Sequence, residues 1–275
     1  MKIDYTFHSH TYRCGHAVGD IEDYVSLAID KGIKVYGVSD HVFLPNIHEP
    51  KTRGDYSLLD EYIEEFKKVK SKYRNKIEMY LGFECEYSDY FKDYYRYLLK
   101  DKGFDYLICG QHFNYDKGYC YGYGFDSRPL SESLPLYKKD LIDAMKSGLF
   151  LYIAHPDIFF MGATELTDEF KELTKEIIEE GIKYNAVFEV NIHGFYRNHD
   201  RRGNHYIDYP VEYFWKEVAK TNIKIVHGGD YHNPDEITDE KYQIKFDEFI
   251  SATNIKFSDI KKIYINYKNR LKNIL

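Results

Sequence analysis

Short apolar runs alternate with longer amphipathic stretches along the chain, and this alternation restricts the fold more than any other feature. Seven runs have the character of buried strands, near residues 3–7, 34–38, 78–83, 106–109, 150–154, 186–190 and 223–226. Apolar residues recur at helical spacing between them. This order of elements is typical of βα units around a parallel sheet. We therefore expect an α/β fold, and 275 residues suffice for one domain of this kind.

Several predicted helices carry recognisable end signals. Asp20 fits the N-cap of one helix, and Gly32 fits its C-terminal end. Thr167 and Gly181 fit the same positions in a later helix, and Pro210 suits the first turn of another. Other helical stretches are expected near 59–69, 90–100 and 141–145, with two more after the last strand.

Side chains that bind metals follow the carboxyl ends of nearly all predicted strands. They are His8, His10 and His16 in HSHTYRCGH, then His41, Glu84, His112, His155, Asp230 and His232. His8 and His10 face the same way if the strand is regular, so the two imidazoles can share one cation. In a parallel barrel the carboxyl ends of the strands meet on one face. We therefore expect these nine residues to form one cluster.

The alternative for any single histidine is an ordinary polar role. Two histidines on one face of a strand can be core residues bonded to backbone carbonyls. We expect such an ordinary surface or core role for the histidines that do not directly follow a predicted strand. These are His48, His193, His199, His205 and His227.

Nine ligands exceed the needs of one ion, because a catalytic zinc usually takes three protein ligands and a water. We expect two to three divalent transition-metal ions. Imidazole and carboxylate donors fit zinc, iron or manganese, and a carboxylate such as Glu84 can bridge two ions. Asp40 precedes His41 and suits a residue that orients an imidazole.

Composition argues against several other classes of protein. The net charge of −7 disfavours a nucleic-acid binder, since such proteins usually carry a basic excess. No segment approaches the roughly 18 apolar residues of a membrane span, and the first residues hold no apolar run of signal-peptide length. We therefore expect a cytoplasmic protein. The four cysteines lack CxxC spacing, which indicates reduced thiols.

The motifs HSH, SDH, GFECE, GQH, AHP and GGDYH, in this order, resemble those of the polymerase and histidinol phosphatase (PHP) superfamily. The details TYRCGHA, GQHF and FEVN are most similar to the monofunctional histidinol-phosphate phosphatases. The resemblance spans the chain. It implies a distorted (β/α)7, TIM-like barrel, formed by a single domain over residues 1–275, with its active site at the carboxyl ends of the strands.

The resemblance also implies three metal positions that share the nine ligands. The first would use His8, His10, Glu84 and Asp230, the second Glu84, His112 and His155, and the third His16, His41 and His232. Glu84 would bridge two of them.

The expected reaction is hydrolysis of a phosphomonoester by a metal-bound hydroxide. Divalent ions lower the pKa of bound water toward ~7 and neutralise charge on a phosphoryl group. The sequence has no GxSxG elbow and no P-loop. Asp40, Glu84 and Asp230 are the candidate catalytic residues. The proton donor to the leaving group stays open between a metal-bound water, Asp40 and Asp230.

The resemblance implies L-histidinol phosphate as the substrate, a small molecule. Arginine suits phosphate, so Arg197 is the first candidate contact, followed by Arg13 and Arg53. Asn191 ends the sixth strand and is a further candidate. Carboxylates for the ammonium group are Glu86, Asp126 and Glu132, and rings for the imidazole are Tyr12, Phe113, Tyr121, Tyr123 and Phe125. Ordinary loop packing is the alternative for each.

Two other functions stay open from the sequence. One is a phosphoesterase of the same superfamily that acts on other small phosphorylated metabolites or on nucleotides. The other is a non-catalytic metal-binding domain. The sequence does not determine the oligomeric state.

Overall fold

The computed structural model describes residues 3–115, 119–120, 130–161, 163–200 and 207–275. Its strands are β1 (Tyr5–Thr6), β2 (Val35–Val38), β3 (Glu78–Cys85), β4 (Tyr106–Cys109), β5 (Phe113–Asn114), β6 (Tyr119–Cys120), β7 (Val187–Asn191) and β8 (Lys224–Gly228). Strands β1 to β4 form a parallel sheet in sequence order, and β7 pairs with β8 in parallel. The short strands β5 and β6 form an antiparallel pair.

The segment around Ile153 joins the two parallel sheets. Ile153 makes single parallel bridges to Cys109 in β4 and to Phe188 in β7. The backbone N–H of Ile153 donates to the carbonyl of Val187 at 2.9 Å, and that of Ala154 donates to the carbonyl of Cys109 at 2.8 Å. The result is a mixed α/β fold with a curled, parallel half-barrel sheet.

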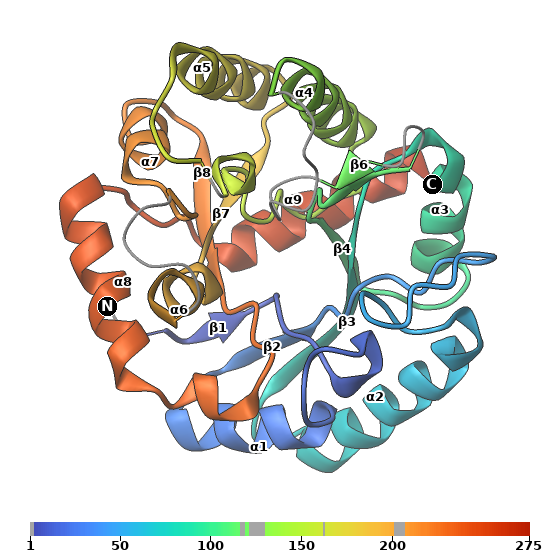
Figure 1. Cartoon of the computed structure of the whole chain (residues 1–275). Helices are drawn as coiled ribbons and strands as arrows, with labels where there is room; N and C mark the ends of the chain where they lie inside the picture. Colours follow the sequence, from blue (N-terminus) through green and yellow to red (C-terminus); the bar gives the residue numbers. More distant parts are fainter. Residues whose placement is uncertain (1–2, 116–118, 121–129, 162, 201–206) are drawn as a thin grey trace.

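Helices surround the curled sheet, as Figure 1 shows. They are α1 (Ile21–Lys31), α2 (Leu59–Tyr73), α3 (Lys92–Lys100), α4 (Leu130–Ser147), α5 (Asp168–Lys183), α6 (His193–Asp200), α7 (Glu212–Val218), α8 (Glu240–Thr253) and α9 (Ile260–Ile274). Asp20 and Asp23 form a capping box at the start of α1, and Gly32 ends this helix with a φ of 83°. No helix among the described residues has the length and apolar character to cross a bilayer.

Helix α9 supports the end of the sheet where β4 begins. The hydroxyl of Tyr267 accepts from the backbone N–H of Leu107 at 3.2 Å and donates to the carbonyl of Leu149 at 2.9 Å. Arg270 donates to the carbonyl of Gly148 at 2.9 Å. In Figure 1 this helix passes behind the strands. The loops that carry the predicted ligands lie at the opposite, carboxyl ends of the strands.

The structure differs from the sequence-based prediction at three points. The stretch 150–154 is not a regular strand, because it makes single bridges instead of a continuous ladder. Helix α5 continues past Gly181 to Lys183, because Gly181 does not adopt the positive φ that ends α1 at Gly32. Pro210 precedes α7, whose N-cap is Val211. The sequence also did not predict the β5–β6 pair or α6.

Candidate metal centre

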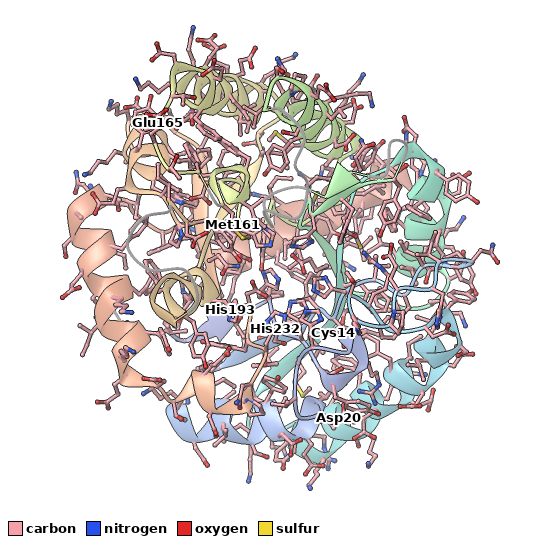
Figure 2. All side chains as sticks on the ribbon, viewed as in Figure 1. Cys14, Asp20, Met161, Glu165, His193 and His232 are labelled. Carbon is pink, nitrogen blue, oxygen red and sulfur yellow. The ribbon has the colours of Figure 1, made fainter. Side chains whose placement is uncertain are left out.

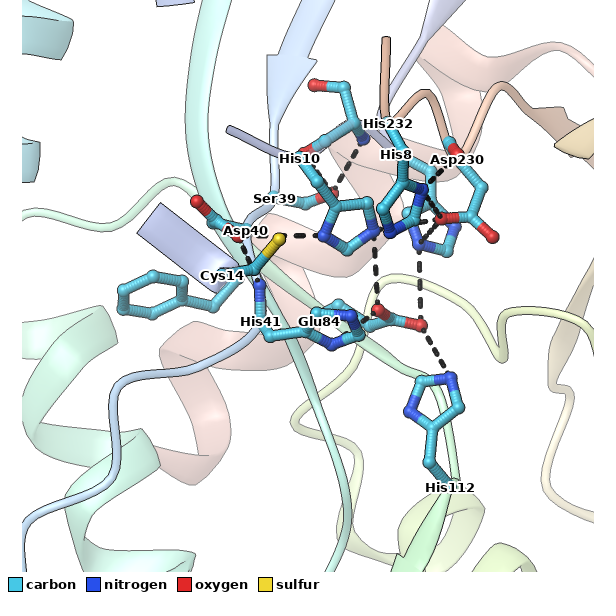
Figure 3. Close-up of polar contacts among 12 residues, drawn as sticks. His8, His10, Cys14, Ser39, Asp40, His41, Glu84, His112, Asp230 and His232 are labelled. Carbon is cyan, nitrogen blue, oxygen red and sulfur yellow. Dashed lines mark hydrogen bonds and ion pairs between the residues drawn. The ribbon is translucent and has the colours of Figure 1, made fainter. Parts of the chain in front are cut away.

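The nine predicted ligands converge at the carboxyl ends of the strands, as Figures 2 and 3 show in part. Seven of them are buried, namely His8, His10, His41, Glu84, His112, His155 and Asp230. His16 and His232 are more exposed. Three overlapping groups bring their ligand atoms within 4.8 Å of one another: His8–His10–Asp230, His8–Glu84–His155 and His10–His41–His232. Residues separated by more than 200 positions therefore form one cluster.

Glu84 lies at the centre of this cluster. Its Oε1 is 2.9 Å from Nε2 of His155 and 3.4 Å from Nε2 of His8, and its Oε2 is 3.1 Å from Nδ1 of His41. His10 and His112 approach the same carboxylate at 3.5 and 3.6 Å. Burial alone would raise the pKa of Glu84, but the surrounding imidazoles hold this pKa well below its usual value. Glu84 is therefore an anion in contact with five histidines.

His16 and His232 present two lone pairs to each other. Nδ1 of His232 is 2.9 Å from the carbonyl of Asp230, and Nδ1 of His16 is 3.2 Å from the carbonyl of Cys14. A carbonyl only accepts, so both Nδ1 atoms carry the proton and both Nε2 atoms of the neutral rings are acceptors. These two Nε2 atoms lie 3.1 Å apart. Burial and the nearby His10 lower the pKa of both rings. A cation between them would turn this repulsion into coordination.

Two further imidazoles are held from behind by carboxylates. Nδ1 of His8 donates to Glu189 at 2.9 and 3.1 Å, and Nδ1 of His112 lies 3.1 Å from Oε1 of Glu86. Each bond orients the ring so that Nε2 is turned toward Glu84. A carboxylate behind a histidine is the usual arrangement around a protein-bound metal.

Two glycines leave room for the buried carboxylates. A Cβ on Gly110 would come within 1.8 Å of Oε1 of Glu84, and a Cβ on Gly228 would come within 2.3 Å of Oε2 of Glu189. Any larger residue at either position would displace the carboxylate beside it.

Several polar atoms in the cluster form no well-directed hydrogen bond with the described residues, although some lie close to a carboxylate. They include Nε2 of His8, both ring nitrogens of His10, Nδ1 of His41 and Oε2 of Glu84. Leaving a buried polar atom unpaired costs about 1–3 kcal/mol, and here several such atoms face one another. Divalent cations would satisfy them together, and imidazole with carboxylate donors fits zinc, iron or manganese. The residues present therefore fit a site for divalent metals.

Asp230 and Asp40 occupy different positions around this cluster. Oδ1 of Asp230 is 2.9 Å from Nε2 of His10, and the residue adopts a φ of 52°, which is uncommon outside glycine. Asp40 accepts from the hydroxyl of Thr11 at 2.5 Å and from the backbone N–H of His41 at 2.9 Å, while its Oδ1 is 3.6 Å from Nδ1 of His10. Asp230 thus faces the ligands directly, whereas Asp40 supports them from outside.

The buried guanidinium groups of Arg13 and Arg53 are both engaged in ion pairs, of which only Arg53–Glu86 is buried on both sides. Arg13 donates to Asp20 at 2.5 and 3.1 Å and to Glu61 at 3.0 Å. Arg53 donates to Glu86 at 3.1 Å. The sequence proposed both arginines as phosphate contacts. In this structure the terminal nitrogens of Arg13, and Nε and the terminal nitrogens of Arg53, are bonded to other groups of the protein.

Glu86 and Asn191 also have internal partners. Glu86 lies between His112 and an arginine and is 1% exposed, so it does not face an open site where an ammonium group could bind. The amide of Asn191 donates to Glu189 at 2.9 Å and to Asp230 at 3.0 Å. Each of these side chains therefore contacts residues of the cluster in this structure.

Other predicted substrate contacts can be placed only in part. Arg197 lies in α6, but its side chain is outside the described part of the chain. Tyr121, Tyr123, Phe125 and Asp126 lie outside the described residues. Tyr12 is half exposed in the loop after β1, and Phe113 begins β5. Glu132 lies in the first turn of α4.

The sequence missed two residues beside the cluster. The ring of His193 lies 4.8 Å from that of His232, and its Nδ1 is 3.5 Å from Oε2 of Glu236. Cys14 is buried with its sulfur within 4.8 Å of the ligand atoms of His16 and His232, and burial raises the pKa of its thiol. His193 follows the end of β7, so the rule that selected the other histidines could have found it.

Comparisons with known proteins agree with this geometry. A curated protein of Deinococcus radiodurans named probable histidinol-phosphatase is 28% identical over 55% of this chain and 59% of its own length. A probable histidinol-phosphatase of Schizosaccharomyces pombe is 23% identical over 84% of this chain and 81% of its own length.

A solved structure has a similar fold. It is the histidinol phosphate phosphatase of Lactococcus lactis in complex with zinc, L-histidinol and phosphate, with a TM-score of 0.68 and 18% identity. The alignment covers 93% of this chain and 95% of that chain. The PHP domain matches residues 6–193, which is more than half of the chain. This match begins in β1 and includes every candidate ligand up to His155, so the chain belongs to the PHP domain family.

Proposed function

We propose that this chain is a metal-dependent phosphomonoester hydrolase that converts L-histidinol phosphate and water to L-histidinol and phosphate. The observation that carries the proposal is the buried cluster in which five imidazoles surround Glu84. Two relatives named probable histidinol-phosphatase, and the fold shared with the Lactococcus lactis phosphatase, support the choice of substrate.

The ligands divide into three sets in this proposal, and the first two share Glu84. His8, His10, Glu84 and Asp230 would hold one ion, Glu84, His112 and His155 a second, and His16, His41 and His232 a third. Oε1 of Glu84 faces His155 of the second set and Oε2 faces His10 of the first set, which suits a carboxylate shared by these two ions. Divalent ions held here would activate water as the nucleophile and neutralise charge on the phosphoryl group.

The protein side chains have separate tasks in the reaction. Glu84 keeps its negative charge among the imidazoles and so holds the cluster together. Asp230 faces His10 directly and is slightly exposed, which places it better than the enclosed Asp40 to exchange a proton with a bound molecule. Asp40 orients His10 and the loop at Thr11.

Arg197 remains our candidate for the phosphate contact. Helix α6 begins two residues after Asn191, which is bonded to Asp230. The helix therefore starts beside the cluster, and His193 at its first position packs against His232. Arginine's planar fork suits phosphate oxygens.

We also propose that the curled sheet belongs to a distorted (β/α)7 barrel and that residues 1–275 form one domain. A parallel bridge between Ser9 and Tyr231 supports closure, because it links the end of β1 to the loop after β8. The backbone N–H of Asp230 donates to the carbonyl of His8 at 2.8 Å at the same place.

A substrate panel tests the proposed activity. Purified protein loaded with zinc, iron or manganese should hydrolyse L-histidinol phosphate with a kcat/KM orders of magnitude above that for p-nitrophenyl phosphate and nucleoside monophosphates, because remote binding energy is lost with mismatched substrates. Similar rates on all substrates would favour a broader phosphoesterase. Stoichiometric metal without hydrolysis would favour a non-catalytic metal-binding domain.

A further inference from the structure

Arg53 is a fully buried cation that takes part in no contact with the nine candidate ligands. Its side chain is 0% exposed and forms ion pairs with Glu49 and Glu86. Nε donates to Glu49 at 2.8 Å, one terminal nitrogen donates to the carbonyl of Val42 at 3.1 Å, and the other to Glu86 at 3.1 Å. The ring of Tyr115 lies 5.8 Å below the guanidinium carbon. These three acceptors and the ring hold the guanidinium group in one orientation.

Glu86 connects this arginine to the cluster. One oxygen of Glu86 accepts from Arg53, and the other lies 3.1 Å from Nδ1 of His112. The opposite nitrogen of His112 is 3.6 Å from Oε1 of Glu84. A continuous chain of contacts therefore runs from Arg53 through two side chains to the centre of the cluster.

The charge of Arg53 keeps Glu86 able to orient the imidazole. Glu86 is buried, with one oxygen bonded to Arg53 and the other 3.1 Å from Nδ1 of His112, so these two contacts set the orientation of the carboxylate. Without the arginine, this buried anion would lose the fixed positive partner that also sets its rotamer. The carboxylate of Glu86 could then turn toward other hydrogen-bond donors, and His112 would lose the contact that orients its ring.

We propose that Arg53 is a positioning residue that acts through Glu86 to hold His112 with Nε2 toward Glu84, and thereby sets metal affinity at the position shared by Glu84, His112 and His155. The inference rests on the proposed metal-dependent function. Arginine is suited to this position because its fork reaches Glu49, Glu86 and a backbone carbonyl at once, which the single ammonium of lysine cannot do.

The test compares Arg53→Met and Arg53→Lys with Glu86→Gln and the double variant. Arg270→Met is the matched control, since Arg270 is a partly buried arginine whose hydrogen bonds, among the described residues, go to the backbone carbonyls of Gly148 and Phe150, near the end of the sheet where β4 begins. Circular dichroism selects the folded variants, and Arg53→Lys serves if Arg53→Met does not fold.

The first readout is metal binding, measured by competition with a chelator. We expect Arg53→Met to weaken one equivalent by about 10–100-fold and to leave the others unchanged, as is usual for residues that support a ligand. Arg53→Lys should lose less. The double variant should resemble Glu86→Gln alone, because the chain is already interrupted. Wild-type binding in Arg53→Met, or losses that add in the double variant, would overturn the proposal.

The second readout is the Nδ1–H proton of His112, observed by NMR in metal-free protein and assigned through its loss in His112→Gln. It should be present in the wild type and in Arg270→Met, and absent or strongly shifted in Arg53→Met. This signal does not depend on activity. If the wild type binds no metal the proposed function fails, whereas an unchanged signal in Arg53→Met removes the positioning role by itself.

Discussion

His8 and His112 both face Oε1 of Glu84 and are both held by a carboxylate, but the second partners of these carboxylates differ. Glu189 behind His8 accepts from the neutral amide of Asn191. Glu86 behind His112 accepts from the charged Arg53. Figure 3 shows His8 and His112 approaching Glu84 from different sides.

The two supports also lead to different parts of the molecule. The amide of Asn191 also donates to Asp230, so the residues that hold His8 contact a second candidate ligand of the same cluster. Arg53 continues to Glu49 and Val42 in the loop after β2. The same local arrangement, a carboxylate behind a histidine, is therefore stabilised by a neutral amide on one side and by a fixed charge on the other. This difference predicts unequal responses to matched substitutions.

Glu84→Gln should have the largest effect, because both supports end at this residue. The amide removes the negative charge and one oxygen, so metal affinity should fall and kcat should drop by more than about 100-fold, beyond the loss typical of a residue that only supports a ligand. Steady-state kinetics and metal analysis measure this. Glu78→Gln, at the exposed start of the same strand, is the control and should behave as wild type. A Glu84→Gln enzyme with near-normal turnover would mean that the two supports do not share a functional centre.

Glu86→Gln should destabilise the metal-free protein more than Glu189→Gln. Glu86→Gln removes one carboxylate from the buried Arg53, and we expect a loss of about 3 kcal/mol, the low end for breaking a buried ion pair, because Glu49 remains. Glu189→Gln should cost less, about 1.5 kcal/mol, the low end for a hydrogen bond to a charged group, because the amide oxygen still accepts from His8 and because His8, unlike Arg53, can release its proton when the carboxylate is removed.

Urea unfolding of both metal-free variants measures this difference directly. Equal losses in the free energy of unfolding would show that the charge of Arg53 does not distinguish the two sides.

The smallest expected effect concerns the number of protons released when metal binds. We expect this number to depend on Glu189 more than on Glu86. Burial opposes a charged imidazole, but Glu189 and Asp230 hold the pKa of His8 well above its usual value, and Asp230 and Asp40 raise the pKa of His10 to about 9. Both rings are protonated at pH 7 in the metal-free protein and must be neutral to bind a cation. Their stabilising ion pairs are complete below pH ~6.5, and that of His10 is lost as the pH rises through about 9.

Apparent metal affinity should therefore increase with pH up to about 9. Calorimetric titration in two buffers of different ionisation enthalpy counts the protons released. Glu189→Gln should lower that count at pH 7, whereas Glu86→Gln should leave it nearly unchanged. An identical reduction in both variants would contradict the comparison.

The sequence predicted the strand order and the position of the cluster because both depend on local pattern. A polar residue directly after a buried strand must lie at the edge of the sheet, and parallel strands bring these edges together. Residue type alone did not show the partners of the arginines. Arg13 and Arg53 carry the right charge for phosphate, but only the fold shows that Glu61 and Glu86, from other segments of the chain, bond to them.

By itself the sequence determined which residues reach the carboxyl ends of the strands, and hence the candidate ligands His8, Glu84, His155 and the others of the cluster. The tertiary structure alone decided which nitrogen of each imidazole is free and which carboxylate stands behind it. Glu189 is 181 residues from His8, so no local pattern could have paired them. Tautomer and charge depend on contacts through space, which exist only after the sheet has curled and brought these segments together.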